Sequence, residues 1–303
     1  MKILITGATG LLGHRLTTLC LESGWDVHYL TTSKSKIKTS KNHKGFYWNP
    51  STGEIDEKAC EGITTIVHLA GASIAQRWTS DTKQKIKDSR IKSTQLLLDT
   101  LTRKNIHIDH FVSASATGCY PSSYTTLYNE SYEGYADGFL GEVIATWEVA
   151  AQSFSTVGAK VSLMRTGIVF DSASGAFPKL VKPIQMRVGA PLGNGKQWQS
   201  WIHLEDAAAY YHHIIKDQLA GIFNVVAPYP VSNDELTHKI ATLLKKPIFL
   251  PAVPAFMLRL LLGKMAAIVL ESQQVSAQKA QDIGFTFQYD LETALQDCID
   301  RLP

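Results

Sequence analysis

A short apolar run, KILIT at positions 2–6, leads directly into the glycine-rich turn GATGLLG. Between a first strand and a first helix, one such glycine permits the tight bend, one lets a pyrophosphate approach the backbone, and one lets helix and strand pack closely. The free N–H groups at the start of the helix favour an anion. The junction therefore predicts a dinucleotide site with contacts from Gly7, Thr9, Gly10, Leu11, Leu12 and Gly13.

Strand-like and helix-like segments alternate along most of the chain. Apolar runs predict strands at 26–30, 63–71, 110–115, 160–170 and 221–227, and helical spacing predicts helices at 11–24, 79–104 and 139–155. This alternation predicts an α/β fold, an NAD(P)-binding Rossmann fold with a doubly wound parallel sheet. Residues 1–170 and 201–227 would form this domain. Residues 171–200 and 228–303 would form a smaller substrate lobe over the carboxyl ends of the strands.

The end of the second predicted strand indicates which cofactor is bound. An NAD site places an acidic residue about 20 residues beyond the glycines to bind the ribose 2′-hydroxyl. Here the strand ends in LTTSKSK, and no acid occurs between Asp26 and Glu54. Hydroxyls and an ammonium suit a 2′-phosphate, so we expect NADP(H), held by Thr31, Thr32, Ser33 and Lys34. Lys38, Lys41 and Lys44 are expected in a solvated loop.

Bulk composition excludes several functional classes. The net charge of +3 is too small to argue for nucleic acid or an anionic membrane. The four cysteines form no CxxC pair and no His/Cys/Asp cluster has ligand spacing, so we expect no metal site, and free thiols in a reducing cytoplasm. The apolar stretch 253–270 is interrupted by Arg259, Gly263 and Lys264. It predicts a buried or partner-facing helix starting at Pro254 rather than a membrane span.

Several segments resemble the extended branch of the short-chain dehydrogenase/reductase superfamily: TGATGLLG, HLAG at 68–71, RIKSTQLL at 90–97 and WIHLEDAA at 201–208. Longer stretches, among them QRWTSDTKQKIKDSRI and FLGEVIATWEVAA, resemble its atypical family of nucleoside-diphosphate-sugar epimerases, also called cell-division-inhibitor-like. The resemblance implies that the backbone of Leu69, Ala70 and Gly71 lines the cofactor, with Arg90 replacing the usual asparagine. Val169 is a further candidate cofactor contact. A small-molecule substrate is implied, and so is a homodimer through the helices at 79–104 and 139–155.

The resemblance also exposes a missing catalytic pair. Members of the superfamily use a Ser or Thr with a Tyr and a Lys, and the last two positions hold Phe139 and Val143 here. Neither can transfer a proton, and losing a general acid costs about 10²–10⁴-fold in rate. Ser115 has the expected spacing from Phe139. The candidate catalytic groups are therefore Ser115, Thr117 and Tyr120, with Tyr132 and Tyr135 as further hydroxyls and Glu142 and Glu148 as acceptors or surface partners.

A glycine-rich segment at 187–203 predicts a lid. Its Trp198 and Trp201 could stack on a substrate or cap the core. His203 and Asp206 are expected to order the following turn, with Asp206 capping the next helix. Arg165 is expected to pair with a carboxylate. Related proteins often hold a nucleotide-sugar phosphate with an Arg where Gln199 and Ser200 stand here, so such a substrate is disfavoured.

Three functions remain open from the sequence. The first is an NADP(H)-dependent oxidoreductase or epimerase-like protein with an atypical site. The second is a non-catalytic NADPH-binding sensor or regulator, which the substitutions at Phe139 and Val143 favour. The third is an assembly protein that uses the apolar segment starting at Pro254 as its interface.

Overall fold

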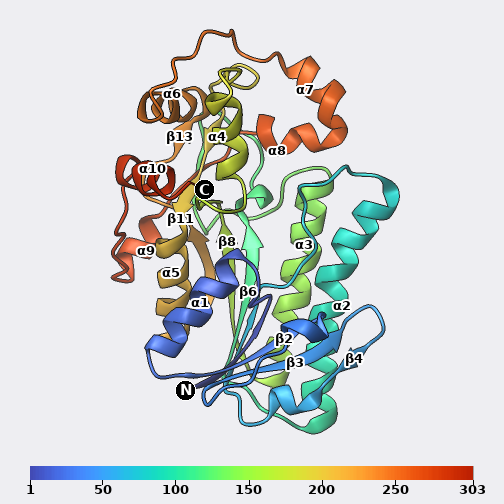
Figure 1. The fold of residues 1–303 in the computed structure, drawn as a ribbon. Helices are drawn as coiled ribbons and strands as arrows, with labels where there is room; N and C mark the ends of the chain where they lie inside the picture. The colour runs from blue at the N-terminus through green and yellow to red at the C-terminus, as the bar shows by residue number, and fades with distance from the viewer. Residues whose placement is uncertain (303) are drawn as a thin grey trace.

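The computed structural model describes residues 1–302, which are built around an eight-stranded sheet of order β12-β8-β6-β5-β1-β2-β3-β4 (Figure 1). Seven strands are parallel, and β4 alone pairs antiparallel, with β3. The strands are β1 (Lys2–Thr6), β2 (Asp26–Thr31), β3 (His43–Asn49), β4 (Glu54–Ile55), β5 (Thr65–His68), β6 (His110–Ala116), β8 (Lys160–Thr166) and β12 (Gly221–Val225).

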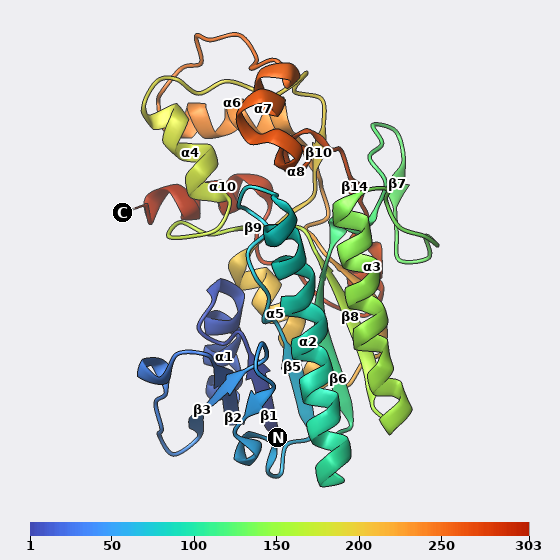
Figure 2. The same ribbon diagram turned by 90° about the vertical axis from the view of Figure 1, so that its right-hand side faces the viewer.

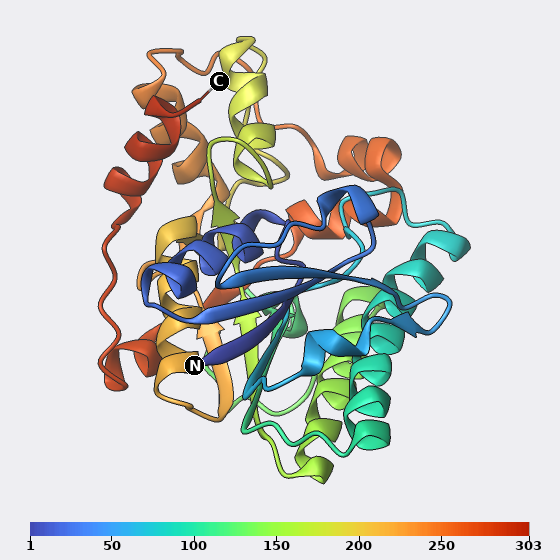
Figure 3. The same cartoon turned by 60° about the horizontal axis from the view of Figure 1, so that its bottom comes forward.

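Helices cover both faces of this sheet. On one face α1 (Leu11–Glu22) packs on α5 (Leu204–Lys216), and on the other α2 (Ser80–Lys104) packs on α3 (Phe139–Gln152). Figure 2 shows α2 and α3 side by side, and Figure 3 shows them on the opposite side of the N-terminal strands from α5. Along β1, Ile3 and Ile5 enter one apolar cluster and Leu4 the other, as a strand buried on both faces requires. The predicted doubly wound fold is confirmed.

The predicted strand at 160–170 is wrong as a single element. The chain leaves the sheet at Gly167, and the following β9 (Ile168–Phe170) pairs instead with β11 (Trp201–His203). A Cβ at Gly167 would clash with the Ser200 carbonyl oxygen, so only glycine permits this crossing of two backbones. The switch carries the chain from the parallel sheet into the smaller lobe.

Other boundaries also differ from the sequence expectation. Only residues 65–68 of the predicted strand at 63–71 form a strand, β5. Strands β3 and β4 were not predicted. Because Lys44 belongs to β3, its expected place in a loop is wrong. The predicted helix at 139–155 ends earlier, with α3, and continues as the 3₁₀ turn η4 (Ser153–Val157).

The smaller lobe has its own apolar cluster, which includes Phe177, Val181, Leu236 and Leu295, and it lies beyond the carboxyl ends of the strands (Figure 1). Its elements are α4 (Phe177–Gln185), β10 (Trp198–Gln199), β13 (Val231–Ser232), α6 (Asn233–Leu243), α7 (Ala255–Leu262), η5 (Gly263–Ala266), α8 (Ala267–Leu270) and α10 (Leu291–Asp300). The remaining elements are β7 (Leu127–Tyr128), which pairs in parallel with β14 (Gln274–Val275), and α9 (Gln278–Asp282), which packs against β12. From the sequence, residues 228–303 were assigned to the smaller lobe. Ala280 and Phe285 of this range pack instead into the apolar cluster that contains residues of α1 and α5.

The apolar stretch 253–270 does not form one helix. It begins after Pro254 as predicted but is divided at Gly263, whose φ of 59° ends α7. The buried alternative is wrong, because Leu260 is 83% exposed and Leu261 is 74% exposed. Within residues 1–302, no helix has the length and apolar character needed to cross a membrane.

We predict that Gly167→Ala lowers the free energy of unfolding by about 1–3 kcal/mol, because the added methyl must displace the Ser200 backbone. Gly118→Ala is the matched control, since its Cβ would meet only ordinary contacts at 3.5 Å from the Ile144 side chain. Urea unfolding of the two variants measures the difference. Equal stabilities would contradict the steric account of the strand switch.

Candidate functional site

The glycine turn has the geometry that the sequence predicts. Gly7 has a φ of 72°, and a Cβ there would lie 2.9 Å from the Leu69 carbonyl carbon. A Cβ on Gly13 would clash with the Gly7 carbonyl oxygen. Helix α1 starts at Leu11 with no side-chain cap at Gly10, so its first N–H groups remain available to an anion. A side chain at either glycine would therefore collide with neighbouring backbone. We call this uncapped turn the glycine cradle.

Buried polar groups hold the neighbouring segment 69–72 beside this turn. The Thr6 hydroxyl accepts the Ala70 N–H at 3.1 Å and lies 2.8 Å from His68 Nδ1. On the other side of the ring, His68 Nε2 lies 2.9 Å from the Ser93 hydroxyl of α2. Burial lowers the pKa of His68 to about 3, so the ring is neutral and serves as a fixed hydrogen-bonding bridge. Leu69 and Ala70 are thereby kept in contact with Gly7.

Arg90 supports the same segment from α2. Its guanidinium donates to the Ala72 carbonyl at 3.2 Å and to the Ile86 carbonyl at 3.0 Å, and it lies 4.7 Å from the centre of the Trp147 ring. Burial lowers its pKa to about 10, and Nε has no partner within residues 1–302. A Cβ on Gly71 would lie 3.3 Å from this guanidinium. Arg90 is therefore a buried cation immediately beneath the predicted cofactor loop.

Hydroxyls and a lysine gather after β2, as predicted. Thr31 is buried and its hydroxyl accepts the Ser33 N–H, while the Ser33 hydroxyl lies 2.9 Å from that of Ser35. Lys34 begins the short 3₁₀ helix η1 (Lys34–Lys36), and its ammonium lies 5.0 Å from the centre of the Tyr47 ring. Thr32 and Lys34 are exposed, so both can reach a ligand without breaking a buried contact.

The two substituted catalytic positions are packed with apolar groups. Phe139 is the first residue of α3, and its ring lies 4.9 Å from that of Trp78. The Lys83 ammonium lies 4.7 Å from the centre of the Phe139 ring. Val143, one turn further along, is buried. Neither Phe139 nor Val143 can donate or accept a proton. The contact of Trp78 with Phe139, which completes this apolar wall, was not predicted from the sequence.

A buried ion pair lies behind the wall. Glu148 of α3 receives two hydrogen bonds from Arg165 of β8, at 3.0 and 2.9 Å, which confirms the predicted carboxylate partner of Arg165. Ser115 donates to one oxygen of Glu148 at 2.5 Å, and Tyr135 donates to the other at 2.8 Å. Burial and the adjacent carboxylate raise the pKa of Tyr135 to about 12. Glu148 therefore accepts four hydrogen bonds from three side chains and is not a solvated helix residue. We call Glu148 and these partners the hub.

Three of the other candidate side chains, Tyr120, Tyr132 and Glu142, also have structural partners. The Tyr120 hydroxyl donates to Asn224 at 2.7 Å and accepts from Arg165 at 3.2 Å, and burial raises its pKa above the ordinary value. The Tyr132 ring packs edge-on against that of Tyr120. Glu142 pairs with Lys87 on the surface of α3. Thr117, in the 3₁₀ turn η3 (Thr117–Cys119), is buried beside them.

The two lid tryptophans have different environments. Trp198 is half-buried and donates to the Tyr124 carbonyl at 3.0 Å, so part of its ring faces outward. Trp201 is 1% exposed and stacks on Phe170 at 5.2 Å, which corrects the expectation that it contacts substrate. Ser200 bonds the backbone of Gln273 and Val275 and is not available to bind a phosphate.

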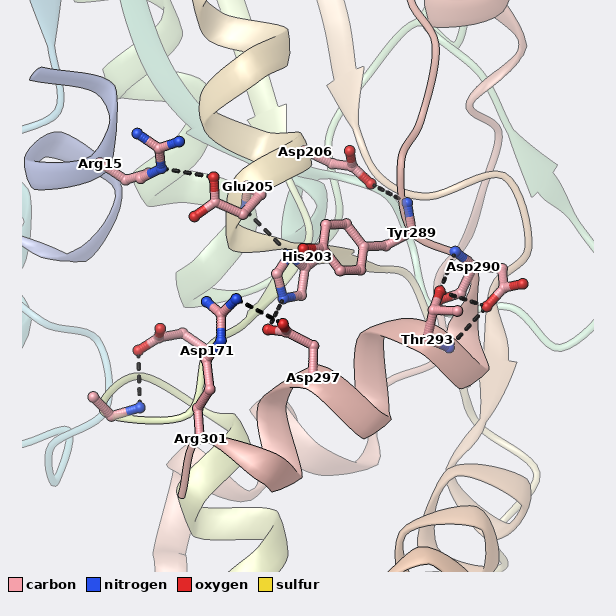
Figure 4. A network of polar contacts seen from close by, with 11 residues as sticks. Arg15, Asp171, His203, Glu205, Asp206, Tyr289, Asp290, Thr293, Asp297 and Arg301 are labelled. Carbon is pink, nitrogen blue, oxygen red and sulfur yellow. Dashed lines mark hydrogen bonds and ion pairs between the residues drawn. The ribbon is translucent and has the colours of Figure 1, made fainter. Parts of the chain in front are cut away.

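A polar clasp joins the C-terminal segment to the start of α5 (Figure 4). The expected capping role of Asp206 is wrong: His203 Nδ1 accepts the Glu205 N–H and caps α5, whereas Asp206 accepts the backbone N–H groups of Gln288 and Tyr289. His203 also stacks on Tyr289 at 3.8 Å. On the α1 side, Arg15 pairs with Glu205 at 2.6 Å. The clasp therefore links the helix that follows the glycine turn to the end of the chain.

The clasp also brings together His203, Asp297 and Cys298, whose ligand atoms lie within 4.8 Å of one another, although their sequence spacing did not indicate this. Asp297 pairs with Arg301 at 2.8 Å and lies 3.2 Å from His203 Nε2. Burial raises the pKa of Cys298 to about 12, which keeps the thiol protonated. The contacts of Asp297 with His203 and Arg301 therefore explain why these side chains lie together within the clasp.

The chain was compared with known proteins. The model of the NAD dependent epimerase/dehydratase family matches residues 3–226, and a domain of unknown function, DUF1731, matches residues 253–298. An epimerase family protein of Staphylococcus aureus (strain MRSA252) is 35% identical over 302 residues, 99% of each chain. The chloroplastic epimerase family protein SDR39U1 homolog of Arabidopsis thaliana is 36% identical over 293 residues, which cover 95% of this chain and 84% of that protein.

Solved structures share the fold. The human epimerase family protein SDR39U1 with NADPH gives a TM-score of 0.85 at 24% identity and covers 100% of both chains. MoeE5 in complex with UDP-glucose and NAD gives a TM-score of 0.80 at 18% identity and covers 99% of each chain. At these identities, the likeness supports the Rossmann architecture and carries no residue assignment.

We predict that Glu148→Gln lowers the free energy of unfolding by about 3–5 kcal/mol, because it leaves the Arg165 guanidinium buried without its counter-charge. Glu142→Gln on the same helix removes an exposed pair with Lys87 and should change stability by less than about 1 kcal/mol. Denaturant unfolding distinguishes the two. Similar small losses would mean that the hub is not structurally important.

Proposed function

The chain belongs to the NAD dependent epimerase/dehydratase family, and from this premise we propose that it is an NADP(H)-dependent oxidoreductase of the short-chain type that acts on a small substrate. The observation that carries this proposal is the pairing of an uncapped glycine cradle with a basic, acid-free segment after β2. A cofactor bound there would supply or accept the hydride.

The residues that would hold the cofactor fit its chemistry. The cradle and the N–H groups of α1 suit the pyrophosphate, and Thr32, Ser33 and Lys34 suit a ribose 2′-phosphate. Human SDR39U1, which has the same fold, was crystallised with NADPH. The proposed cofactor contacts are Gly7, Thr9, Gly10, Leu11, Leu12, Gly13, Thr31, Thr32, Ser33, Lys34, Leu69, Ala70, Gly71, Arg90 and Val169.

The proton must come from somewhere other than the usual phenol. The half-buried Phe139, in contact with Trp78, stands where a tyrosine would act and offers no proton. Ser115 donates its proton to Glu148, so toward a substrate its oxygen can only accept. We therefore propose a substrate whose own acidic group would protonate the oxygen left as an alkoxide when the cofactor's hydride adds to the carbonyl carbon. A separate hydroxyl or N–H of the substrate would donate a hydrogen bond to Ser115, and Trp198 would form a wall of the pocket. Thr117 and Tyr120 would shape that pocket.

The two-lobe division is part of this proposal. Residues 1–170 and 201–227 would bind the cofactor, and residues 171–200 and 228–303 would cover the substrate. We also propose a homodimer through the outer faces of α2 and α3, where Ile91 and Val149 are exposed.

A second candidate is a non-catalytic sensor of NADPH. It is favoured by the hydrogen bonds of Ser115, Tyr120 and Tyr135, all of which donate to other groups of the chain. The clasp from Arg15 to the C-terminal segment would give such a sensor a path from the cofactor turn to the smaller lobe.

Calorimetry tests the cofactor assignment. We predict that Lys34→Ala weakens NADPH binding by about 10–100-fold, the value of a charge-assisted hydrogen bond, and leaves NADH binding unchanged. Lys38→Ala, a change of the same type in the same segment, should leave both affinities unchanged. Wild-type protein that binds NADH as tightly as NADPH would overturn the proposal.

Turnover separates the enzyme from the sensor. Purified protein is supplied with NADPH and a panel of aldehydes, ketones and quinones, and cofactor oxidation is followed by absorbance. Oxidation above background, reduced in Ser115→Ala, supports hydride transfer with the proposed role of Ser115. Tight NADPH binding with no oxidation across the panel favours the sensor.

A further inference from the structure

The net charge of the whole chain conceals a strong asymmetry between its parts. Segments 172–204 and 228–270, which build most of the smaller lobe, contain nine Lys or Arg residues and two acids, Asp234 and Glu235. The whole chain has 30 basic and 27 acidic residues, so the remainder carries 21 and 25. These two segments are therefore strongly cationic, whereas the C-terminal segment 271–303, which completes the lobe, contains six acidic and two basic residues.

Large apolar side chains protrude from the same lobe. On α7, Phe256 is 68% exposed, Leu260 is 83% exposed and Leu261 is 74% exposed. These residues and Met257 lie one helical turn apart on the outer side, while Leu258 packs inward. Phe249 and Leu250 are exposed on the segment that leads to α7. Exposed apolar groups gathered in this way mark an interaction site.

Along the sequence, cations precede and follow these apolar residues, with no acidic residue between them. Lys245 and Lys246 precede the exposed Phe249, Arg259 lies on α7, and Lys264 follows it in η5. Between Glu235 and Glu271 the sequence contains no acidic residue. We define the α7 surface as the exposed apolar residues together with these cations: Lys245, Lys246, Phe249, Leu250, Phe256, Met257, Arg259, Leu260, Leu261 and Lys264.

We propose that the α7 surface docks on an anionic lipid surface. The apolar side chains would enter the boundary between headgroups and acyl chains, while the four cations would meet the lipid phosphates and carboxylates. The eight residues of α7 are too few to cross a bilayer, so the contact is peripheral. Figure 1 places α7 at the end of the molecule opposite the N-terminus, so docking would leave the Rossmann sheet projecting away from the lipid.

Charge and shape favour this occupant over others. In a symmetric pair of chains, two α7 surfaces in contact would bring cations against cations, which opposes self-association there. Nucleic acid would engage the cations but leave Leu260 and Leu261 in water. A protein partner that binds helical segments usually offers a groove to receive them. Binding to vesicles in the absence of any other protein therefore distinguishes lipid docking from such a partner.

Vesicle co-sedimentation of the full chain tests the proposal. We expect binding to phosphatidylcholine vesicles containing about 30 mol% phosphatidylserine, weak binding to phosphatidylcholine alone, and release at about 0.5 M NaCl. The double variant Leu260→Gln/Leu261→Gln should lose at least about tenfold in affinity, because two side chains no longer enter the lipid. Arg259→Gln/Lys264→Gln should lose about fivefold for each cation removed.

Matched controls distinguish lipid docking from a general loss of structure. Val149→Gln changes an apolar residue that is 68% exposed on α3, and Lys85→Gln removes an exposed cation on α2, so both should bind vesicles like the wild type. Circular dichroism melts confirm that every variant is folded. Equal binding to both vesicle types, or binding unchanged in Leu260→Gln/Leu261→Gln, overturns the proposal. So does a dimer by light scattering that the same double change converts to monomer.

Discussion

The buried pair of Glu148 and Arg165 constrains the carboxyl end of the sheet more than any other interaction. Two charges removed from water must be surrounded by hydrogen-bonding partners, because an incompletely satisfied buried charge costs several kcal/mol. Ser115 of β6 and Tyr135 donate hydrogen bonds to Glu148. The Tyr120 hydroxyl accepts a hydrogen bond from Arg165. Strands β6 and β8 and helix α3 are joined at one point as a result. The same requirement engages the hydroxyls that a catalytic site would otherwise use.

The proposed cofactor site follows a different rule, because backbone groups line it and side chains hold that backbone in place. Glycines leave the turn open, the neutral ring of His68 ties β1 to α2, and the buried guanidinium of Arg90 supports the loop after β5. None of these contacts needs the missing tyrosine or lysine. The contacts around the glycine turn are therefore independent of the positions that Phe139 and Val143 occupy.

The smaller lobe has one face bonded to the Rossmann domain and another that is exposed. The inner face is tied to α5 by the clasp of His203, Asp206 and their partners in the C-terminal segment, so its position depends on the helix that packs against α1. The outer face carries the α7 surface, which the apolar cluster of the lobe does not cover. Under the proposed lipid docking, the clasp would connect the docked lobe to the helices of the Rossmann sheet.

Local signals in the sequence were sufficient for much of this structure. The residues of β1, the glycine turn and the helix expected at 79–104 were predicted, because apolar runs, helical spacing and glycines act within a few residues of chain. Contacts between distant segments decided the rest. The strand at 160–170 breaks where Gly167 meets Ser200, Asp206 binds Gln288 and Tyr289 rather than its own helix, and Trp201 is buried against Phe170. The sequence determined that a dinucleotide site exists, because backbone turns are encoded locally. Only the tertiary structure decided which hydroxyls are engaged and where charge accumulates, because hydrogen bonding and electrostatics depend on distances in space rather than along the chain.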